Sequence, residues 1–301
     1  ERIDDRVGNN TFGSNITDAD GGKAERSELN KNDLFPSLNM KYQMNEKNSL
    51  RFAFSRTVTR PSFIEMAPFL YQESYGSAQI RGNADLQNGY NYNIDLRYEL
   101  FEKNGDMLSI TAYYKHLKAP IERVQTLSGG SAVHSFRNAD NGMATGVEIE
   151  FRKEIVKDLR FGVNGSYMYT NVKLPEGGAY TNSQRALQGA SPYLANADLT
   201  YSPAFSNDRQ LSVALLYNLQ GPRIHSVGIS GLGDIKQQPV HTLNFTGSYR
   251  FNRRFAVKLQ VNDLLNQDIL FKQEVPTTGD KVEVERFRKG TGFEVGFSYD
   301  L

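Results

Sequence analysis

Residues 90–100 read Tyr-Asn-Tyr-Asn-Ile-Asp-Leu-Arg-Tyr-Glu-Leu, and their strict alternation of apolar and polar side chains decides the fold. Successive side chains of an extended strand point to opposite faces. The tyrosines, Ile94 and Leu96 therefore share one face, whereas Asn93, Asp95 and Arg97 share the other. A helix would scatter both sets around its circumference. The segment predicts a β-strand with one apolar and one polar face.

The same alternation recurs from residue 33 to the end of the chain. It predicts eleven strands, at residues 33–44, 49–57, 90–100, 107–117, 144–152, 159–170, 191–201, 211–219, 239–251, 255–265 and 291–301. No segment gives a helical pattern of comparable strength. Short connections such as residues 45–48 alternate with long ones such as residues 58–88 and 118–143. This favours a transmembrane barrel, which has short periplasmic turns and long extracellular loops.

The apolar faces of the predicted strands carry aromatic residues towards both ends. Those near short turns are Tyr42, Tyr98, Phe151, Phe161, Tyr201, Tyr249, Phe255 and Tyr299; those nearer long loops are Tyr90, Tyr114, Tyr169, Tyr193 and Tyr217. A soluble antiparallel sheet also alternates, but it predicts an aliphatic inward face. Two aromatic girdles around an aliphatic band are typical of the lipid interface. We therefore expect an all-β, antiparallel transmembrane barrel in the outer membrane of a Gram-negative bacterium.

The composition of the 301 residues excludes several other classes. The chain has no Cys, so disulfides, thiolate metal sites and Cys nucleophiles are excluded. Its formal net charge is only +1, which gives no reason to expect a nucleic-acid partner. The four histidines, at positions 116, 134, 225 and 241, show no metal-ligand spacing. We expect no metal site, no cofactor and no catalytic residue.

The odd number of predicted strands indicates that they do not form a complete barrel. Bacterial barrels close with an even number of strands, and an open edge in lipid leaves costly unpaired backbone groups. Residues 33–301 are therefore expected to form part of a barrel that another segment completes. Residues 1–32 are polar and predict an extracellular loop or the end of an N-terminal fragment. The N-terminus lacks a signal-peptide pattern, so we expect a chain that is mature, truncated or cut.

Six segments resemble the TonB-dependent receptors, particularly their outer-membrane-protein β-barrel subfamily. They are Ser55-Arg56-Thr57-Val58-Thr59-Arg60-Pro61-Ser62-Phe63, Gly82-Asn83-Ala84-Asp85-Leu86, Asn138-Ala139-Asp140 with Gly146-Val147-Glu148, Leu187-Gln188-Gly189-Ala190-Ser191-Pro192-Tyr193, Val261-Asn262-Asp263-Leu264-Leu265-Asn266, and residues 292–301. Departures are Ala84, where the family often has Pro, Asp263, where it usually has Asn, and Leu301, where it usually has Phe. The last departure weakens the C-terminal signal for barrel insertion.

The resemblance implies a barrel of roughly 22 strands around a plugged lumen. This chain would supply about the 11 C-terminal strands, whereas the plug and the TonB-contacting segment would lie outside it. The implied partners are outer-membrane lipid or lipopolysaccharide, the plug and N-terminal half of the barrel, and TonB through the plug. A small-molecule, glycan or peptide ligand is the expected cargo.

Candidate ligand contacts lie in the long loops, where exposed aromatic and polar side chains suit recognition. They are Phe63, Phe69, Tyr71, Tyr75, Arg81, Gln188 and Arg223. A structural role in folding the loops remains an equal alternative. The ladder Glu148, Glu150 and Arg152 predicts lining of the lumen rather than acid–base chemistry. Residues 228–234 predict an outer loop rather than a phosphate site, and residues 281–289 predict an extension of the last hairpin.

A transmembrane barrel of this kind could be an active transporter, a passive or assembly-related barrel, or an enzyme. The resemblance implies TonB-driven active uptake of a scarce or bulky ligand. A passive or assembly-related barrel without TonB coupling is the alternative, and a predicted plug upstream would discriminate between them. A barrel enzyme needs a His paired with Asp or Ser at the outer rim, and the sequence offers no such pair.

Overall fold

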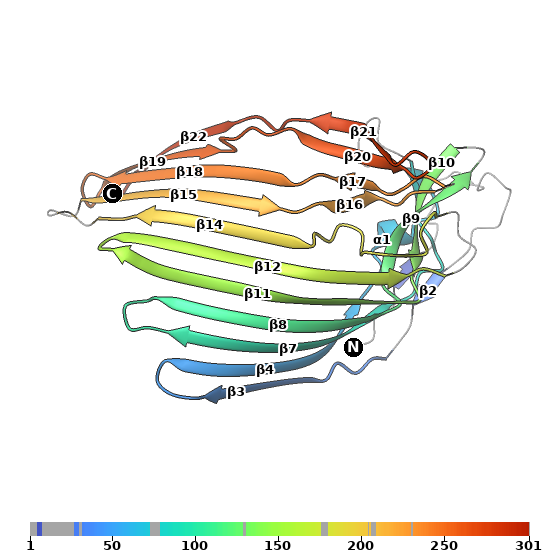
Figure 1. The fold of residues 1–301 in the computed structure, drawn as a ribbon, viewed down its shortest axis with the longest axis horizontal. Coiled ribbons are helices and arrows are strands. Elements are labelled where there is room, and N and C mark those ends of the chain that lie inside the picture. The colour runs from blue at the N-terminus through green and yellow to red at the C-terminus, as the bar shows by residue number, and fades with distance from the viewer. Residues whose placement is uncertain are drawn as a thin grey trace.

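The fold is described from a computed structural model that covers residues 5–7, 27–29, 32–72, 79–128, 131–175, 180–203, 205, 209–229 and 231–300. The described chain is all β apart from one four-residue helix, α1 (Phe63–Met66). A large antiparallel sheet forms the body of the molecule, and smaller sheets made by the long connections gather at one of its ends (Figure 1). We call this end the long-loop end.

Eleven strands form the body of the large sheet, and each pairs antiparallel with the next of the eleven; the two-residue strand β13 (Gln184–Arg185) adds to β12 as a twelfth. They are β3 (Ser37–Gln43), β4 (Asn48–Thr59), β7 (Gly89–Phe101), β8 (Met107–Lys118), β11 (Asn141–Val156), β12 (Leu159–Lys173), β14 (Tyr193–Tyr201), β15 (Gln210–Gln220), β18 (Val240–Arg250), β19 (Phe255–Asn262) and β22 (Gly292–Tyr299). All eleven predicted strands are confirmed. The first begins later than predicted, after Pro36, whose missing N–H cannot join a ladder.

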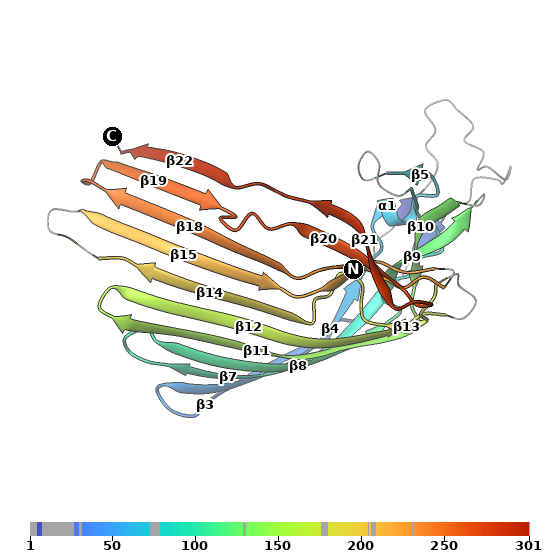
Figure 2. The ribbon, with the colours of Figure 1, turned by 45° about the horizontal axis from the view of Figure 1, so that its top comes forward.

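The sheet is bowed, and its middle strands bulge away from its two edge strands (Figures 1 and 2). Within the described residues β3 and β22 each pair on one side only, so the sheet is an open trough rather than a closed barrel. This agrees with the expectation that the eleven strands do not close alone. Residues 5–7 and 27–29 form a small antiparallel pair, β1 (Asp5–Val7) and β2 (Ser27–Leu29).

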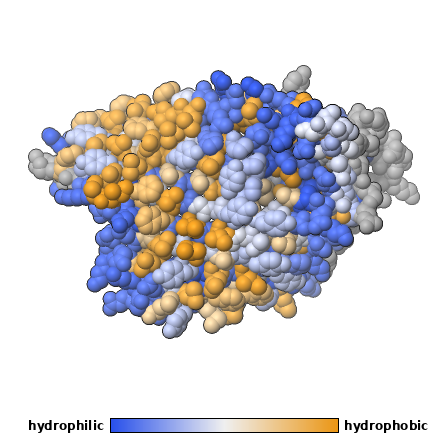
Figure 3. All heavy atoms as spheres, in the orientation of Figure 1, coloured by the Kyte–Doolittle hydropathy of each residue, from blue (hydrophilic) through white to orange (hydrophobic). Residues whose placement is uncertain are grey.

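The strand register confirms the two predicted faces. Leu96 pairs with Ala112, which pairs with Val147, so these apolar side chains lie on the same face of the sheet. Leu96 and Val147 are both well exposed, as expected for residues that face lipid. Figure 3 shows the convex side, where hydrophobic surface gathers over the strands and hydrophilic surface covers the long-loop end.

The long connections contain structure that the sequence analysis did not predict. They form α1, β5 (Leu70–Tyr71), β6 (Ile80–Arg81), β9 (Ile121–Ser128), β10 (Ser131–Asn138), β13 (Gln184–Arg185), β16 (Arg223–Ser226) and β17 (Ile235–Gln237). We call these eight elements, together with the segments that join them to one another and to the large sheet, the loop layer. The hairpin β20 (Ile269–Val275) with β21 (Asp280–Phe287) continues β19 and β22 past the rim, as predicted for residues 281–289.

The loop layer also contains most of the buried apolar side chains of the described chain. Fully or almost fully buried side chains there include Met66, Ile80, Leu86, Val124 and Leu174. Six of the eight elements have four residues or fewer, too short for a period-two pattern to be recognised in the sequence. Among the described residues, no helix is both long enough and apolar enough to cross a membrane.

Candidate ligand-binding site

The segment Arg60-Pro61-Ser62-Phe63 starts helix α1 through a capping box. The Ser62 backbone N–H donates to Glu65 Oε2 at 2.7 Å, and the Glu65 N–H donates back to Ser62 Oγ at 3.4 Å. This reciprocal pair satisfies backbone donors that a helix start leaves free. The cap fixes Glu65 at the start of the loop layer, while Met66 is buried beneath it.

Gly82-Asn83, from a second segment that resembles the receptor family, holds α1 in place. The Asn83 N–H donates to the Glu65 carbonyl at 2.7 Å, and the Asn83 side-chain amide donates to the Phe136 carbonyl at 2.9 Å. A Cβ atom at Gly82 would lie 2.3 Å from the carbonyl oxygen of Ala67, so only glycine permits this approach. The two segments that resemble the receptor family therefore meet in space and assemble the loop layer.

Gly82→Ala is expected to loosen the loop layer by about 2–3 kcal/mol, because the new methyl group overlaps backbone atoms that cannot rotate away. Hydrogen exchange of the full-length protein should show faster exchange in α1 and β10. Gly296→Ala is the matched control, because its Cβ would meet Lys258 Cβ at an ordinary 3.9 Å. Unchanged exchange around α1 in Gly82→Ala contradicts the close approach.

Asn138 attaches the β9–β10 hairpin to the ends of the large sheet. Its side-chain amide donates to the carbonyls of Gln87 at 2.8 Å and Ala119 at 2.9 Å, and its Oδ1 accepts the Gln87 N–H at 2.8 Å. One asparagine thus joins three segments that are distant in sequence. The hairpin lies at the long-loop end of the trough (Figure 2).

The segment Leu187-Gln188-Gly189 joins the hairpin to β16. The Gly189 N–H donates to the Ile224 carbonyl at 2.9 Å, and the Gln188 amide donates to the His225 carbonyl at 2.6 Å. Gly189 has a φ of 76°, in the left-handed region that glycine adopts without strain. Gln188 Oε1 is buried and accepts no hydrogen bond among the described atoms.

These contacts enclose a hollow of about 290 Å³, which we call the outer hollow. Its lining residues are Glu65, Ile121, Glu122, Arg123, Phe136, Gln188, Gly189, Arg223, Ile224 and His225. Arg223 is oriented by its Nε, which donates to Gln237 Oε1 at 2.7 Å, and Arg123 Nε donates to His134 Nδ1 at 2.8 Å. The hollow combines a phenyl and an imidazole ring, two guanidinium groups, two carboxylates and a free amide oxygen, a composition suited to binding a polar ligand.

An ion pair lies at the floor of the outer hollow. Arg185 Nη2 lies 2.8 Å from Glu122 Oε2, and the two side chains are only 3% and 4% exposed. Burial raises the pKa of the Glu122 carboxyl, and the Arg185 guanidinium opposes that rise. Because Glu122 lies on β9 and Arg185 on β13, the pair links two separate loops of the layer.

The structure brings together two of the seven predicted ligand contacts, Gln188 and Arg223, in the outer hollow. Phe63 and Phe69 are exposed on the loop layer outside its lining, with Tyr71 in edge contact with Phe69 at 6.2 Å between ring centroids. Arg81 is half-buried in β6, and Tyr75 lies outside the described residues.

Five polar or aromatic members of the hollow were not predicted from the sequence, namely Glu65, Glu122, Arg123, Phe136 and His225. The capping box at Ser62 and Glu65 was the one local signal that could have located the first of them. The others depend on contacts between different loops. Among the described residues, no group of three His, Cys, Asp or Glu side chains could hold a metal ion.

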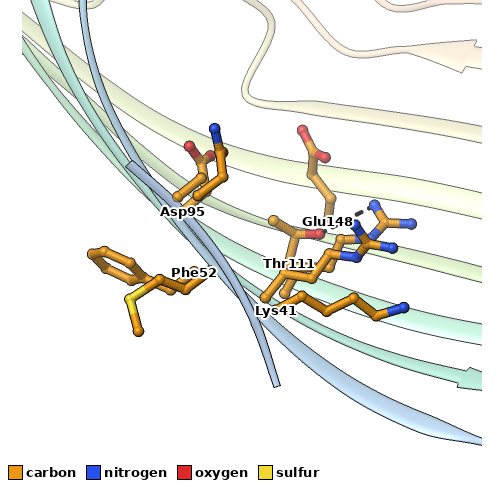
Figure 4. A pocket seen from close by; sticks show the side chains of 10 residues that line it. Lys41, Phe52, Asp95, Thr111 and Glu148 are labelled. Carbon is orange, nitrogen blue, oxygen red and sulfur yellow. Dashed lines mark hydrogen bonds between the residues drawn. The ribbon is translucent and has the colours of Figure 1, made fainter. Parts of the chain in front are cut away.

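The polar face of the trough carries two adjoining hollows of about 340 Å³ each. Figure 4 shows Lys41, Asp95, Thr111 and Glu148 on one side of the sheet and Phe52 on the other. This confirms the predicted placement of Glu148 on the polar face.

An ion-pair network on the same face joins three strands, β4, β7 and β11. Glu99 accepts from Arg51 Nε at 2.7 Å and Arg97 Nε at 2.9 Å, and Glu150 pairs with Arg152 at 2.7 Å and with Arg97 at 3.8 Å. Two members of the predicted ladder, Glu150 and Arg152, therefore take part in ion pairs along the trough wall. The buried Ser49 hydroxyl also donates to Glu99 Oε2 at 3.0 Å, so this carboxylate accepts from three side-chain donors on the trough wall.

Comparison with known proteins agrees with this architecture. The model of the Outer membrane protein beta-barrel family matches residues 14–299, and the chain belongs to that family. The Ferric enterobactin receptor of Pseudomonas aeruginosa is 22% identical over 253 residues, which cover 77% of this chain and 33% of that protein. The chain is therefore a wall segment of an outer-membrane β-barrel and spans about a third of this relative.

Solved structures show the same fold. The ferric enterobactin receptor of P. aeruginosa in complex with enterobactin superposes with a TM-score of 0.64 at 18% identity, covering 91% of this chain and 42% of that chain. The ferric yersiniabactin uptake receptor of Yersinia pestis superposes with a TM-score of 0.63 at 14% identity, covering 94% and 40%. The siderophore receptor PirA of Acinetobacter baumannii gives 0.59 at 15% identity, covering 88% and 40%.

Proposed function

We propose that the full-length protein is a TonB-dependent receptor that takes up an iron–siderophore complex, with this chain supplying barrel wall and part of the outer binding site. The observation that carries the proposal is the outer hollow, a polar and aromatic site assembled at the long-loop end by segments that resemble the receptor family. The similarity to ferric siderophore receptors supports the ligand class.

The chemistry of the hollow suits this ligand class. Ferric catecholate complexes are anionic, and Arg123 and Arg223 present guanidinium groups that form strong charge-assisted hydrogen bonds with anionic oxygens. Phe136 offers a ring against which an aromatic catechol can pack. Gln188 Oε1 is a buried acceptor that a ligand N–H or hydroxyl would satisfy. Phe63, Phe69, Tyr71 and Arg81 are proposed to extend the contact surface above the hollow.

The energy source and the gate belong to parts of the protein beyond this chain. The outer membrane holds no ATP, so accumulation against a gradient requires coupling to the inner membrane, and the family resemblance points to TonB acting on a plug in the lumen. The ionic polar face of the trough supplies the wall against which such a plug would lie. Glycans and peptides are the alternative cargo classes, and a passive barrel is the alternative mechanism.

Uptake of radioactive iron from ferric enterobactin is expected in cells whose only siderophore receptor is the full-length protein. It should fall to background when TonB is deleted, because the ligand then binds without being released inwards. Uptake that continues unchanged without TonB, with the protein correctly inserted, identifies a passive channel. Uptake of neither this nor any other ferric siderophore excludes the ligand class.

A further inference from the structure

The convex face carries a second polar feature at the long-loop ends of β8, β11 and β12. On these strands Leu117 and Val172 are buried beneath the loop layer, on the inner side. Side chains alternate along a strand, so the next residues, Lys118 and Lys173, point outwards. Asn141 lies between them at the start of β11, and all three side chains are exposed.

The register places these three residues in one row. Asn141 pairs with Lys118 on β8 and with Lys173 on β12. Directly opposed residues in antiparallel strands lie ~5 Å apart at Cα, so the two lysines are separated by about 10 Å across Asn141. In the described part of the chain, neither lysine forms an ion pair with a carboxylate. His116 lies one row nearer the middle of the same face and is also exposed.

The height of the row matches the boundary of the outer leaflet. On β8 the outward residues below Lys118 include Tyr114, Ala112 and Ile110, which are exposed and apolar or aromatic. Lys118 lies eight residues beyond Ile110. At ~3.4 Å per residue and a tilt of about 40°, this raises the lysine by roughly 20 Å, compared with an apolar band about 25 Å tall. The row therefore lies where lipid headgroups begin.

The neighbouring outward cation is already neutralised. Arg56 on β4 lies 3.6 Å from Asp33 Oδ1, and its guanidinium stacks over the Tyr90 ring at 4.6 Å. Tyr90 in turn donates to Asp33 Oδ2 at 2.9 Å. Unlike Arg56, Lys118 and Lys173 form no ion pair among the described residues.

We propose that Lys118, Asn141 and Lys173 bind the phosphate group of a phosphorylated glycolipid in the outer leaflet. Two ammonium groups about 10 Å apart can approach one phosphate from both sides as point charges. The Asn141 amide can donate to a phosphate oxygen or accept from a sugar hydroxyl. The apolar and aromatic rows below accommodate acyl chains. The proposal depends on the outer-membrane location alone and is independent of the ligand that the protein imports.

Native mass spectrometry of the full-length protein in detergent tests this site, with bis-phosphorylated lipid A as the probe. Each lysine is expected to contribute roughly fivefold in affinity, so Lys118→Gln/Lys173→Gln should bind about 25-fold more weakly than the wild type. Lys153→Gln is the matched control, because Lys153 is an exposed lysine on the same convex face of β11, at the short-turn end. It should bind like the wild type, and dephosphorylated lipid A should bind the wild type and the double variant equally weakly.

Three outcomes overturn the proposal. The first is equal affinity of the wild type and the double variant for phosphorylated lipid A, and the second is an equal loss in Lys153→Gln. The third is binding of phosphatidylglycerol as tight as that of lipid A, which identifies a general anionic surface instead of a glycolipid site. A heat-dependent shift in gel mobility verifies that each variant barrel is folded.

Discussion

Replacing Arg185 with methionine is expected to open the loop layer at neutral pH while the large sheet stays folded. The change leaves the Glu122 carboxylate buried without the cation that lies 2.8 Å from it. An uncompensated buried charge costs about 3 kcal/mol or more, because neither water nor a partner solvates it. Amides of β9 and β10 should therefore lose protection against hydrogen exchange by about 100-fold, at 1.4 kcal/mol for each factor of ten.

The same variant has a defined pH dependence. Burial raises the pKa of Glu122, and loss of Arg185 removes the interaction that opposes the rise. A raised pKa in the folded state means that the stability from this group is present at low pH and is lost as the pH rises through that pKa. Hydrogen exchange of Arg185→Met should therefore show the protection factors of β9 recovering as the pH falls from about 8 towards 5. This range of ~3 pH units lies above the ordinary carboxyl pKa and therefore covers a raised one.

The double variant Glu122→Leu/Arg185→Met separates the charge effect from a loss of packing. It removes both charges and should restore most of the protection, because well-packed apolar pairs often replace buried ion pairs without loss. If the double variant is as open as Arg185→Met, packing by the arginine stem rather than its charge holds the layer together. No change in Arg185→Met at neutral pH contradicts the structural role of the pair.

The large sheet could be predicted from sequence because each of its strands has two chemically different environments. Lipid on one side and a polar lumen on the other impose a period of two that no helix reproduces, as residues 90–100 illustrate. The regular alternation of short and long connections added the membrane orientation. The predicted start of the first strand, at residue 33, was too early. Pro36 has no N–H to donate to the ladder, and β3 begins at Ser37.

The loop layer could not be predicted in the same way. Most of its elements have four residues or fewer, and β6 and β10 form a parallel bridge between His134 and Ile80, which no local pattern encodes. The Glu122–Arg185 pair likewise joins two different loops, and each residue alone reads as an ordinary surface charge. Gly82, Asn83 and Asn138 belong to segments that resemble the receptor family. Only the structure shows what they do, which is to hold the loops of the layer together through close backbone contact and hydrogen bonds.

The candidate site was predicted only in part, because its residues come from loops that are separate in sequence. Gln188 and Arg223 were chosen as polar residues on long loops, and both line the outer hollow. Phe63 and Phe69 were chosen on the same ground, but they lie on the exposed surface of the layer outside that lining. Exposure and residue type can nominate loop residues, whereas convergence on one cavity depends on how separate loops pack.

The binding of ferric enterobactin to the purified full-length protein tests the central claim most directly. In the wild type, Arg223 and Gln188 are expected to contact the ligand, so Gln188→Ala/Arg223→Ala should bind about 100-fold more weakly, at roughly 1.5 kcal/mol or more for each hydrogen bond to a charged partner. Arg254→Ala, in the short turn at the other end of the barrel, should bind like the wild type. Equal dissociation constants for the wild type and the double variant contradict a ligand site in the outer hollow.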